Sequence, residues 1–423
     1  MKKTAFLLGF IAGLGFTAAA QLTIEDCLAK ARENYPAVRQ YDLIGRAKDY
    51  TLANAAKAFL PQFHLNLRAS YQSDVTSVPV DIPGLEIPSL NKDQYQAVIE
   101  ANQVLWDGGA VRAQKKQTDA GAEVEVQQLE VELYALRERV HQLFFGILLL
   151  DVRLEQNRVL REELDRNFST ISGYVAYGTA HAADLDAVQV EQLQAKQAHT
   201  QLIAGRKAYV EMLGRMIGEN PDASVALEKP AADWADAWDV FPEKTNRPEL
   251  RLFDAQENWY DSQQASVRSA AMPKAGLFLQ GGAGRPGLNM LAPKFDFFYI
   301  GGIRLSWNFG ALYTRGNDLR KIGINRETVA VRRAIFLYNL QLLSAREHQE
   351  IRRLQEVMKQ DDEIIRLREN IRKSAEAKVA NGTLTAADLM RELGREHLAR
   401  QTKATHEIDL LAAIFQLNHL NNP

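Results

Sequence analysis

The placement of proline divides the sequence into stretches that favour very long helices. No proline occurs between Pro88 and Pro221, or between Pro293 and Pro423. An interior proline removes a helical hydrogen bond and clashes with the preceding turn, so both stretches are free to form uninterrupted helices. This pattern predicts a mostly α-helical chain.

The first of these stretches also carries a heptad repeat of apolar residues. After a polar break at Asn157 and Arg161 the apolar pattern resumes with Leu164. Spaced alternately by four and three residues, the seam consists of Leu129, Leu133, Leu136, Val140, Leu143, Ile147, Leu150 and Leu154. Such a seam predicts coiled-coil packing against neighbouring helices. A helix over residues 110–172 is roughly 95 Å long at ~1.5 Å per residue, and residues 312–379 favour a helix of comparable length.

Segments of the first half recur in the second half in the same order. The matched pairs are NYPAVRQ (34–40) and NRPELRL (246–252), LPQFHLNL (60–67) and MPKAGLFL (272–279), VLWDGGA (104–110) and LSWNFGA (305–311), and VAYGTAHAADL (175–185) and VANGTLTAADL (379–389). They predict a tandem repeat in which each copy runs short helix, strand, loop, strand, very long helix, turn and shorter helix.

This repeat sets the expected domain boundaries. The first repeat covers 21–219, a Pro- and Trp-rich connector covers 220–246, and the second repeat covers 247–423. The expected strands lie at about 62–73, 94–106, 275–283 and 297–309, and the expected helical hairpins at 110–219 and 311–420.

The N-terminus predicts export from the cytoplasm. Lys2 and Lys3 precede a short apolar run, and a small-residue cleavage site ends at Ala20, which is the pattern of a signal peptide over residues 1–20. Cys27, the single cysteine, lies too far beyond that site to carry a lipid anchor, so we expect an exported chain that is not lipidated and has no intrachain disulfide. No later run is long enough for a transmembrane helix.

The expected strands alternate between apolar and polar residues. They have about ten residues each, the length that a tilted strand needs to cross a bilayer. A sheet in lipid must close on itself, and four strands are too few, so several chains must each contribute four strands; three chains would give a twelve-strand β-barrel. On this hypothesis the lipid-facing residues are Phe63, Leu65, Leu67, Tyr71, Ile303, Leu305 and Trp307. The pore-lining residues are His64, Asn66, Arg68, Glu100 and Arg304.

The order of elements, the duplication and the segment RPELRLFDAQENWYDSQQASVRSAAMPKAGLFLQG (247–281) resemble the TolC-like outer-membrane efflux proteins, or outer membrane factors. This resemblance implies a homotrimer whose β-barrel in the outer membrane continues into a coiled-coil α-barrel tunnel in the periplasm. It further implies docking through a periplasmic adaptor protein onto an inner-membrane pump. The expected function is a passive exit duct of a tripartite efflux or type I secretion system, without catalysis.

Two G-x5-D turns join the helices of the expected hairpins. Glycine accepts the positive φ that ends a helix, and the carboxylates or the threonine hydroxyls can cap the returning helix. The resemblance implies that these turns form the periplasmic tip that contacts the adaptor. The tip residues are Tyr177, Gly178, Thr179, Asp184, Asn381, Gly382, Thr383 and Asp388. The family carries a Val-Gly pair where this chain has Tyr177-Gly178 and Asn381-Gly382, which leaves the adaptor open. Glu376 and Asp186 are acidic gating candidates near the tip.

Other functional classes have less support. The eight histidines form no HExxH motif or Cys/His cluster, and no serine or cysteine nucleophile has a recognisable base pattern, so we expect no catalytic residues, no metal and no cofactor. A net charge of -2 gives no reason to expect a nucleic-acid partner. Two alternatives remain open, a periplasmic adaptor and an exported structural coiled-coil protein with a soluble β domain. The sequence does not identify the transported substrate or the pump type.

Overall fold

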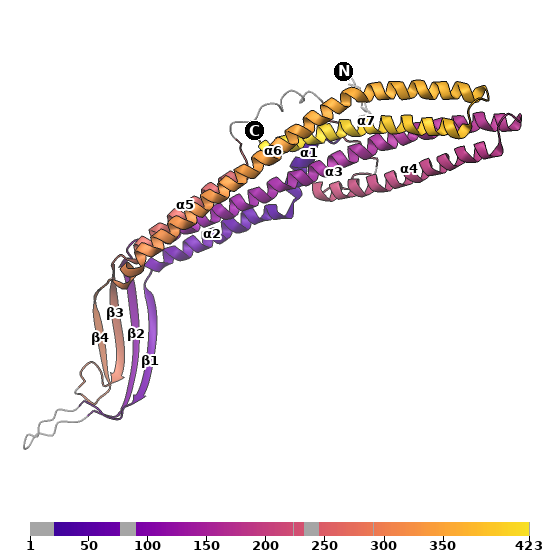
Figure 1. The fold of residues 1–423 in the computed structure, drawn as a ribbon. Coiled ribbons are helices and arrows are strands. Elements are labelled where there is room, and N and C mark those ends of the chain that lie inside the picture. The colour runs from indigo at the N-terminus through magenta and orange to yellow at the C-terminus, as the bar shows by residue number, and fades with distance from the viewer. Residues whose placement is uncertain (1–20, 77–89, 223, 232–244, 291, 423) are drawn as a thin grey trace, which may run out of the picture. The chain divides into compact units, whose positions relative to one another are not determined.

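The computed structural model describes residues 21–76, 90–222, 224–231, 245–290 and 292–422 of the chain. It contains long helices and one antiparallel sheet, which confirms a mostly helical fold with a small β portion (Figure 1). The expected signal peptide and parts of the first strand–strand loop and of the connector lie outside the described residues. Among the described residues, no helix is both long enough and apolar enough to cross a membrane.

The described elements run along the chain as follows. They are α1 (Ile24–Asn34), η1 (Pro36–Arg39), α2 (Gln40–Ala56), η2 (Lys57–Phe59), β1 (Gln62–Tyr71), β2 (Asp93–Trp106), α3 (Ala110–Ala176), α4 (Ala182–Ile217), α5 (Pro248–Ala270), β3 (Lys274–Arg285), β4 (Asp296–Ser306), α6 (Gly310–Ala380) and α7 (Ala386–Asn421). The long helices α3 and α6 have 67 and 71 residues, and the returning helices α4 and α7 have 36 residues each.

The chain divides into two compact units. Unit 1 consists of Met1–Val38, Glu132–Asn246 and Asn339–Pro423, and unit 2 consists of Arg39–Val131 and Arg247–Tyr338. The helices α3 and α6 each contribute one part to either unit.

Unit 2 contains the sheet, whose strands lie in the order β1-β2-β3-β4 with antiparallel pairing throughout (Figure 1). The register of β2 against β3 shifts between Val104 and Trp106. The apolar alternation of this strand slips near Gln103, because a bulge places two residues of one strand opposite one residue of its partner. Ion pairs of Arg326 with Asp261 (3.1 Å) and Arg333 with Asp254 (2.7 Å) join α6 to α5 in this unit.

Unit 1 buries the heptad seam of α3 among the other helices. Val140, Phe144 and Ile147 of α3 are fully buried in a core cluster that also contains residues of α1, α4 and α7. The polar break in the seam has a structural role, since the Asn157 side-chain amide donates to the Ala195 carbonyl of α4 at 3.0 Å. A polar group buried in a helix pair needs such a partner, and one polar position in a seam fixes the register of the two helices.

Candidate functional site

The register of the sheet gathers its apolar side chains on one face. Leu65 pairs with Ile99, Ile99 with Gly281, and Gly281 with Tyr299. Paired residues point to the same face, and up to the bulge every pair joins two odd-numbered or two even-numbered residues. The odd-numbered residues of all four strands therefore share one face, which we call the apolar face.

The apolar face is uncovered. Leu67, Phe297 and Ile303 are 74%, 88% and 75% exposed. Its exposed large side chains are Phe63, Leu65, Leu67, Tyr71, Tyr95, Ile99, Leu277, Leu279, Phe297, Tyr299, Ile303 and Leu305. A contiguous exposed apolar patch of this kind is rare on a protein surface that meets only water and marks contact with a membrane or another protein. All the predicted lipid-facing strand residues except Trp307 lie on this face.

Trp307 lies just beyond the end of β4. Its indole N–H donates to the Ala271 carbonyl at 3.1 Å, and its ring centroid lies 4.7 Å from that of Phe309. The side chain is half exposed, so one edge of the indole packs at the strand end while the rest remains accessible.

The opposite face of the sheet, which we call the polar face, carries most of the polar side chains of the strands together with Val98, Phe278, Phe298 and Ile300, and it includes a hydrogen-bonded carboxylate. Glu100 of β2 accepts hydrogen bonds from the side-chain amides of Asn102 and Gln280, both at 2.9 Å. Arg304 of β4 lies 3.5 Å from the same carboxylate and 4.7 Å from the ring centroid of Phe278. The sheet thus brings together Glu100 and Arg304, two of the predicted pore-lining residues that are far apart in sequence.

The three predicted pore-lining residues of β1 lie on this polar face as well. His64 pairs directly with Glu100, and Asn66 and Arg68 follow at the next even-numbered positions. All three are exposed. The polar face therefore combines acidic, basic and neutral hydrogen-bonding groups.

The two hairpin turns have similar backbone geometry. Gly178 and Gly382 have φ values of 72° and 71°, in the left-handed region that favours glycine. The hydroxyls of Thr179 and Thr383 each donate at 3.0 Å to a carbonyl of the preceding helix, Tyr174 and Lys378 respectively. These hydroxyls therefore close the first helix of each hairpin and do not cap the returning helix.

The returning helices are capped in two different ways. At the first turn the backbone N–H of His181 donates to the Asp184 carboxylate at 3.0 Å. At the second turn the cap is Thr385, whose hydroxyl oxygen accepts from the backbone N–H of Asp388 at 3.1 Å. Thr385 directly precedes α7 in extended conformation, whereas Thr383 lies too early to reach its first turn. Sequence analysis missed Thr385, although a threonine followed three residues later by an acidic residue is a capping signal.

The tips differ in their side chains. Tyr177 is 87% exposed at the first tip. At the corresponding position of the second tip, the Asn381 amide donates to the Ala377 carbonyl at 2.8 Å. The first tip thus presents an aromatic ring where the second presents a polar group bonded to its own helix.

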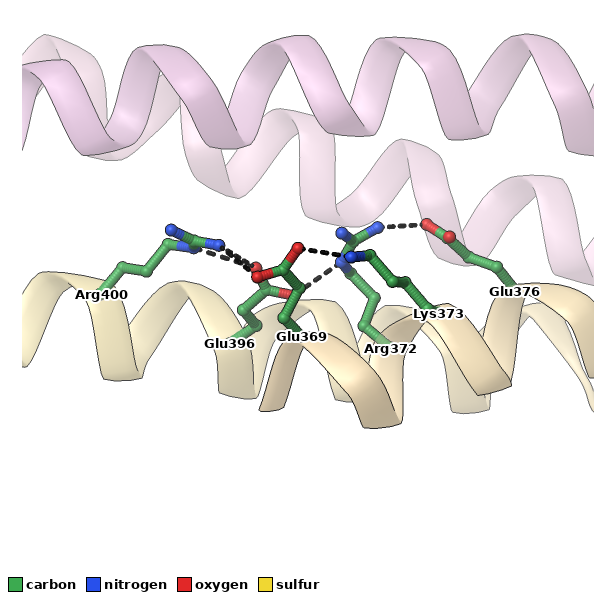
Figure 2. Close-up of polar contacts among 6 residues, drawn as sticks. All are labelled: Glu369, Arg372, Lys373, Glu376, Glu396 and Arg400. Carbon is green, nitrogen blue, oxygen red and sulfur yellow. Dashed lines mark hydrogen bonds and ion pairs between the residues drawn. The ribbon is translucent and has the colours of Figure 1, made fainter. Parts of the chain in front are cut away.

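A cluster of charged residues lies on α6 and α7 near the second turn (Figure 2). Arg372 of α6 donates to Glu396 of α7 at 2.6 Å and also to Glu376, and Arg400 donates to Glu396 at 2.9 Å. The Glu396 side chain is only 4% exposed, so the two arginines compensate a buried negative charge. Glu376, a gating candidate, is thus ion-paired within its own helix, whereas Asp186 on α4 is exposed.

A cavity of about 540 Å³ lies beside this cluster within unit 1. It is lined by Glu163 and Tyr174 of α3 and by Arg372 and Glu376 of α6, among other residues. Burial raises the pKa of the Glu163 carboxyl, and the nearby Arg372 opposes that rise. At this position the first hairpin therefore places an acidic group next to the charged cluster of the second hairpin.

The fold built from these helical hairpins and this four-stranded sheet is shared with solved outer-membrane channels. The outer-membrane channel OprN matches with a TM-score of 0.67 and 13% identity over 94% of this chain and 89% of that chain. CusC matches with a TM-score of 0.69 and 12% identity over 95% and 92%. The open state of the Neisseria gonorrhoeae MtrE outer membrane channel matches with a TM-score of 0.59 and 15% identity over 94% and 90%. At these identities the comparisons show a shared fold.

The family comparison agrees with the fold. Residues 27–219 match the family described as outer membrane efflux protein. This part of the chain is therefore similar to that family, in agreement with the resemblance that the sequence indicated. No curated protein matches the chain.

Proposed function

We propose that the chain is the subunit of a passive outer-membrane exit duct. Three copies contribute their sheets to a twelve-strand β-barrel in the outer membrane and their helical hairpins to an α-barrel tunnel in the periplasm. The duct serves a tripartite efflux or type I secretion system and receives substrates from an inner-membrane pump and its adaptor. The protein performs no chemistry of its own.

The apolar face of the sheet is the observation that carries this proposal. Burying one large apolar side chain in an apolar environment is favourable by about 1.5–3 kcal/mol, and this face exposes a dozen of them on all four strands. Lipid would supply that environment. The opposite face, where Glu100 and Arg304 lie, needs water.

The edges of the sheet support a barrel shared between subunits. β1 and β4 are the edge strands, so each has one row of backbone N–H and C=O groups without a partner strand in the described chain. Hydrocarbon cannot satisfy those groups, and four strands cannot close alone. Pairing of β1 with β4 of a neighbouring copy would satisfy both edges.

The hairpin turns are the proposed adaptor contact. Both tips expose a glycine in the left-handed conformation, and Tyr177 adds an exposed aromatic ring. Exposed aromatic residues are enriched in protein–protein interfaces, and the capped turns present one at a defined position. The predicted set comprises Tyr177, Gly178, Thr179, Asp184, Asn381, Gly382, Thr383 and Asp388.

Cysteine cross-linking between the two edge strands tests the proposed trimer. Within one chain β1 and β4 are three strand spacings apart, roughly 14 Å, which is beyond the ~7 Å reach of a disulfide. In a Cys27→Ala background, Asn66→Cys on β1 is combined in turn with Phe298→Cys, Ile300→Cys or Gly302→Cys on β4. We expect at least one pair to oxidise to a covalent trimer on a non-reducing gel.

The control pair combines Asn66→Cys with Tyr299→Cys, which lies on the opposite face of β4. It should cross-link much less, because the two thiols point away from each other. Absence of a covalent trimer for every same-face pair, or recovery of the protein in the soluble periplasmic fraction, would contradict the proposal and favour the adaptor or structural alternatives.

A further inference from the structure

A second cavity lies within unit 1, between α3, α6 and α7, at residues remote in sequence from both turns. It has a volume of about 400 Å³. Phe145 of α3 and Ile408 of α7 supply apolar wall, and Glu138, His141, Glu347 and Asp409 supply polar groups. Cavities of this size and mixed lining are typical of small-molecule sites. We call it the α3–α7 cavity.

The charged groups of the α3–α7 cavity are all acidic. No lysine or arginine is among its lining residues. Burial raises the pKa of both the Glu347 and the Asp409 carboxyls. Neither carboxylate has a hydrogen bond or an ion pair within the part of the chain that the structure describes. A partly desolvated carboxylate in this state gains from any cation that can reach it.

The surrounding cations do not pair with these carboxylates. Arg346 lies near Glu347, and Arg353, Arg153 and His406 lie near Asp409. Arg353 is engaged in a bidentate contact with Glu350, at 2.6 and 2.8 Å. His406 is engaged with Asp361 at 2.8 Å. These contacts direct the two side chains to other carboxylates.

His141 is a second, independent feature of the cavity. It is 6% exposed, and neither of its ring nitrogens has a hydrogen-bond partner in the described chain. The rings of Phe415 and His419 pack edge-on against it at centroid distances of 5.8 and 5.9 Å. Burial, assisted by Arg137, lowers its pKa to about 4. At neutral pH the imidazole is therefore uncharged and offers one acceptor nitrogen and one N–H donor.

We propose that the α3–α7 cavity binds a small organic cation with N–H donors and an apolar body, such as a primary amine or an amidine. The ammonium group donates one N–H to His141 and is attracted by the acidic side chains of the lining. The apolar body lies against Phe145 and Ile408. A metal ion fits less well, because no group of three or more possible ligand side chains in the described chain has metal-binding geometry.

This site does not depend on the proposed duct function. All its residues belong to unit 1, so binding requires neither a pump nor an adaptor. A protein that forms no channel would still bind the amine, and a functional duct that binds no amine would overturn only this inference.

Calorimetry on the full-length protein in detergent provides the test, with 2-phenylethylamine as the probe. The comparison ligands are 3-phenylpropionate, which has the opposite charge, and phenyltrimethylammonium, which has no N–H donor. We expect saturable binding of the amine and no binding of the anion. Phenyltrimethylammonium should bind at least about tenfold more weakly than the amine, because a tenfold loss corresponds to one lost charge-assisted hydrogen bond.

Variants assign the binding to the cavity. Glu347→Gln combined with Asp409→Asn should weaken amine binding at least about tenfold, and His141→Phe about fivefold, because each removes an acceptor for the ammonium group. Glu356→Gln is the matched control, since it also lies on α6 but pairs with Lys359 and does not line the cavity. It should bind the amine as the parent does, and thermal unfolding of every variant confirms that it is folded.

The inference is overturned if the parent protein binds no amine saturably, or if it binds the carboxylate ligand equally well. It is also overturned if Glu356→Gln weakens binding as much as the double variant. A different result would point to a second copy of the chain as the occupant of the cavity. In that case the parent protein binds no amine, and His141→Phe no longer forms the oligomer that the parent forms.

Discussion

The sheet of unit 2 and the helices of unit 1 distribute apolar side chains in opposite ways. The helices bury Val140, Phe144 and Ile147 completely and leave ion pairs such as Arg366 with Glu363 exposed. The sheet exposes Leu67 and its neighbours and collects its hydrogen-bonded side chains on the other face. One chain thus contains a part organised for water and a part organised for an apolar surrounding.

The heptad seam of the helices and the alternation of the strands differ in what they predict about the surroundings of their apolar residues. A heptad seam implies an interior, because the only way to cover it is to pack other helices on it. Strict alternation in a strand defines two faces but does not say which face meets water. Which face meets water depends on how the strands pair and on what covers them. The register places the apolar residues of all four strands on one face, and the exposed fractions show that this face is uncovered.

The largest expected effect is in the helical core. Phe144→Ala removes a fully buried aromatic ring from the cluster of α1, α3, α4 and α7, and we expect it to lower the free energy of unfolding of unit 1 by about 4 kcal/mol. The matched control is Leu398→Ala on α7, where the side chain is 61% exposed and the change should be under about 0.5 kcal/mol. Thermal unfolding in detergent measures both, and equal effects would mean that the helical unit is not organised around this core.

The next effect separates the two faces of β1. Leu65→Arg places a charge on the apolar face, at a cost of about 3 kcal/mol if that face meets lipid near the bilayer midplane. We expect it to reduce the amount of assembled trimer in the outer-membrane fraction. Asn66→Arg, one residue further and on the polar face, should assemble as the parent does. Equal tolerance of both arginines would remove the distinction between the faces.

The pH dependence of stability sharpens the description of the helical unit. Burial holds the pKa of His141 at about 4, below its ordinary value of 6.5. Between these values the unfolded chain binds a proton that the folded chain does not, so stability present above pH 6.5 is lost as pH falls. At pH 4.5 we expect a loss of about 2 kcal/mol relative to His141→Phe.

Subtracting the pH-dependent stability of His141→Phe from that of the parent protein separates the contribution of His141 from the contributions of its neighbours. The pKa values of Glu347 and Asp409 are raised, so these groups add stability as pH falls, but they are present in both proteins. Parallel thermal-unfolding profiles of the parent and His141→Phe from pH 7 to 4.5 would show that the imidazole is not held neutral.

The smallest effect concerns two glycines of α3 and its turn. Gly178 has a φ of 72° and open space around it, so Gly178→Ala should destabilise by about 1 kcal/mol through backbone strain alone. Gly173 also has open space but no positive φ, and Gly173→Ala should stabilise the helix by up to about 1 kcal/mol. Unfolding temperatures of the two variants should therefore shift in opposite directions.

Much of the fold was accessible from the sequence because its signals are local. Proline-free stretches and heptads predicted helices near those found at Ala110–Ala176 and Gly310–Ala380. Alternation predicted strands near β1 and β4. Each of these signals depends on residues a few positions apart, so no knowledge of distant partners was needed.

The site was less accessible because its contacts join distant parts of the chain. The pairing of Glu100 with Arg304 depends on the register of three strands, and the contacts of Glu396 depend on how α6 and α7 align. In the sequence His141 borders the apolar stretch 143–150, and only the packing shows that its nitrogens lack partners. Periodicity assigns a residue to a face, but it does not identify the residue opposite.

The most direct measurement of the central claim is thiol accessibility on adjacent positions of β1. In a Cys27→Ala background, Leu65→Cys and Asn66→Cys are exposed in isolated outer membranes to a charged, water-soluble maleimide. The account predicts rapid labelling of Asn66→Cys and little labelling of Leu65→Cys until detergent removes the lipid. Equal labelling of both thiols in membranes, or faster labelling of Leu65→Cys, would contradict it.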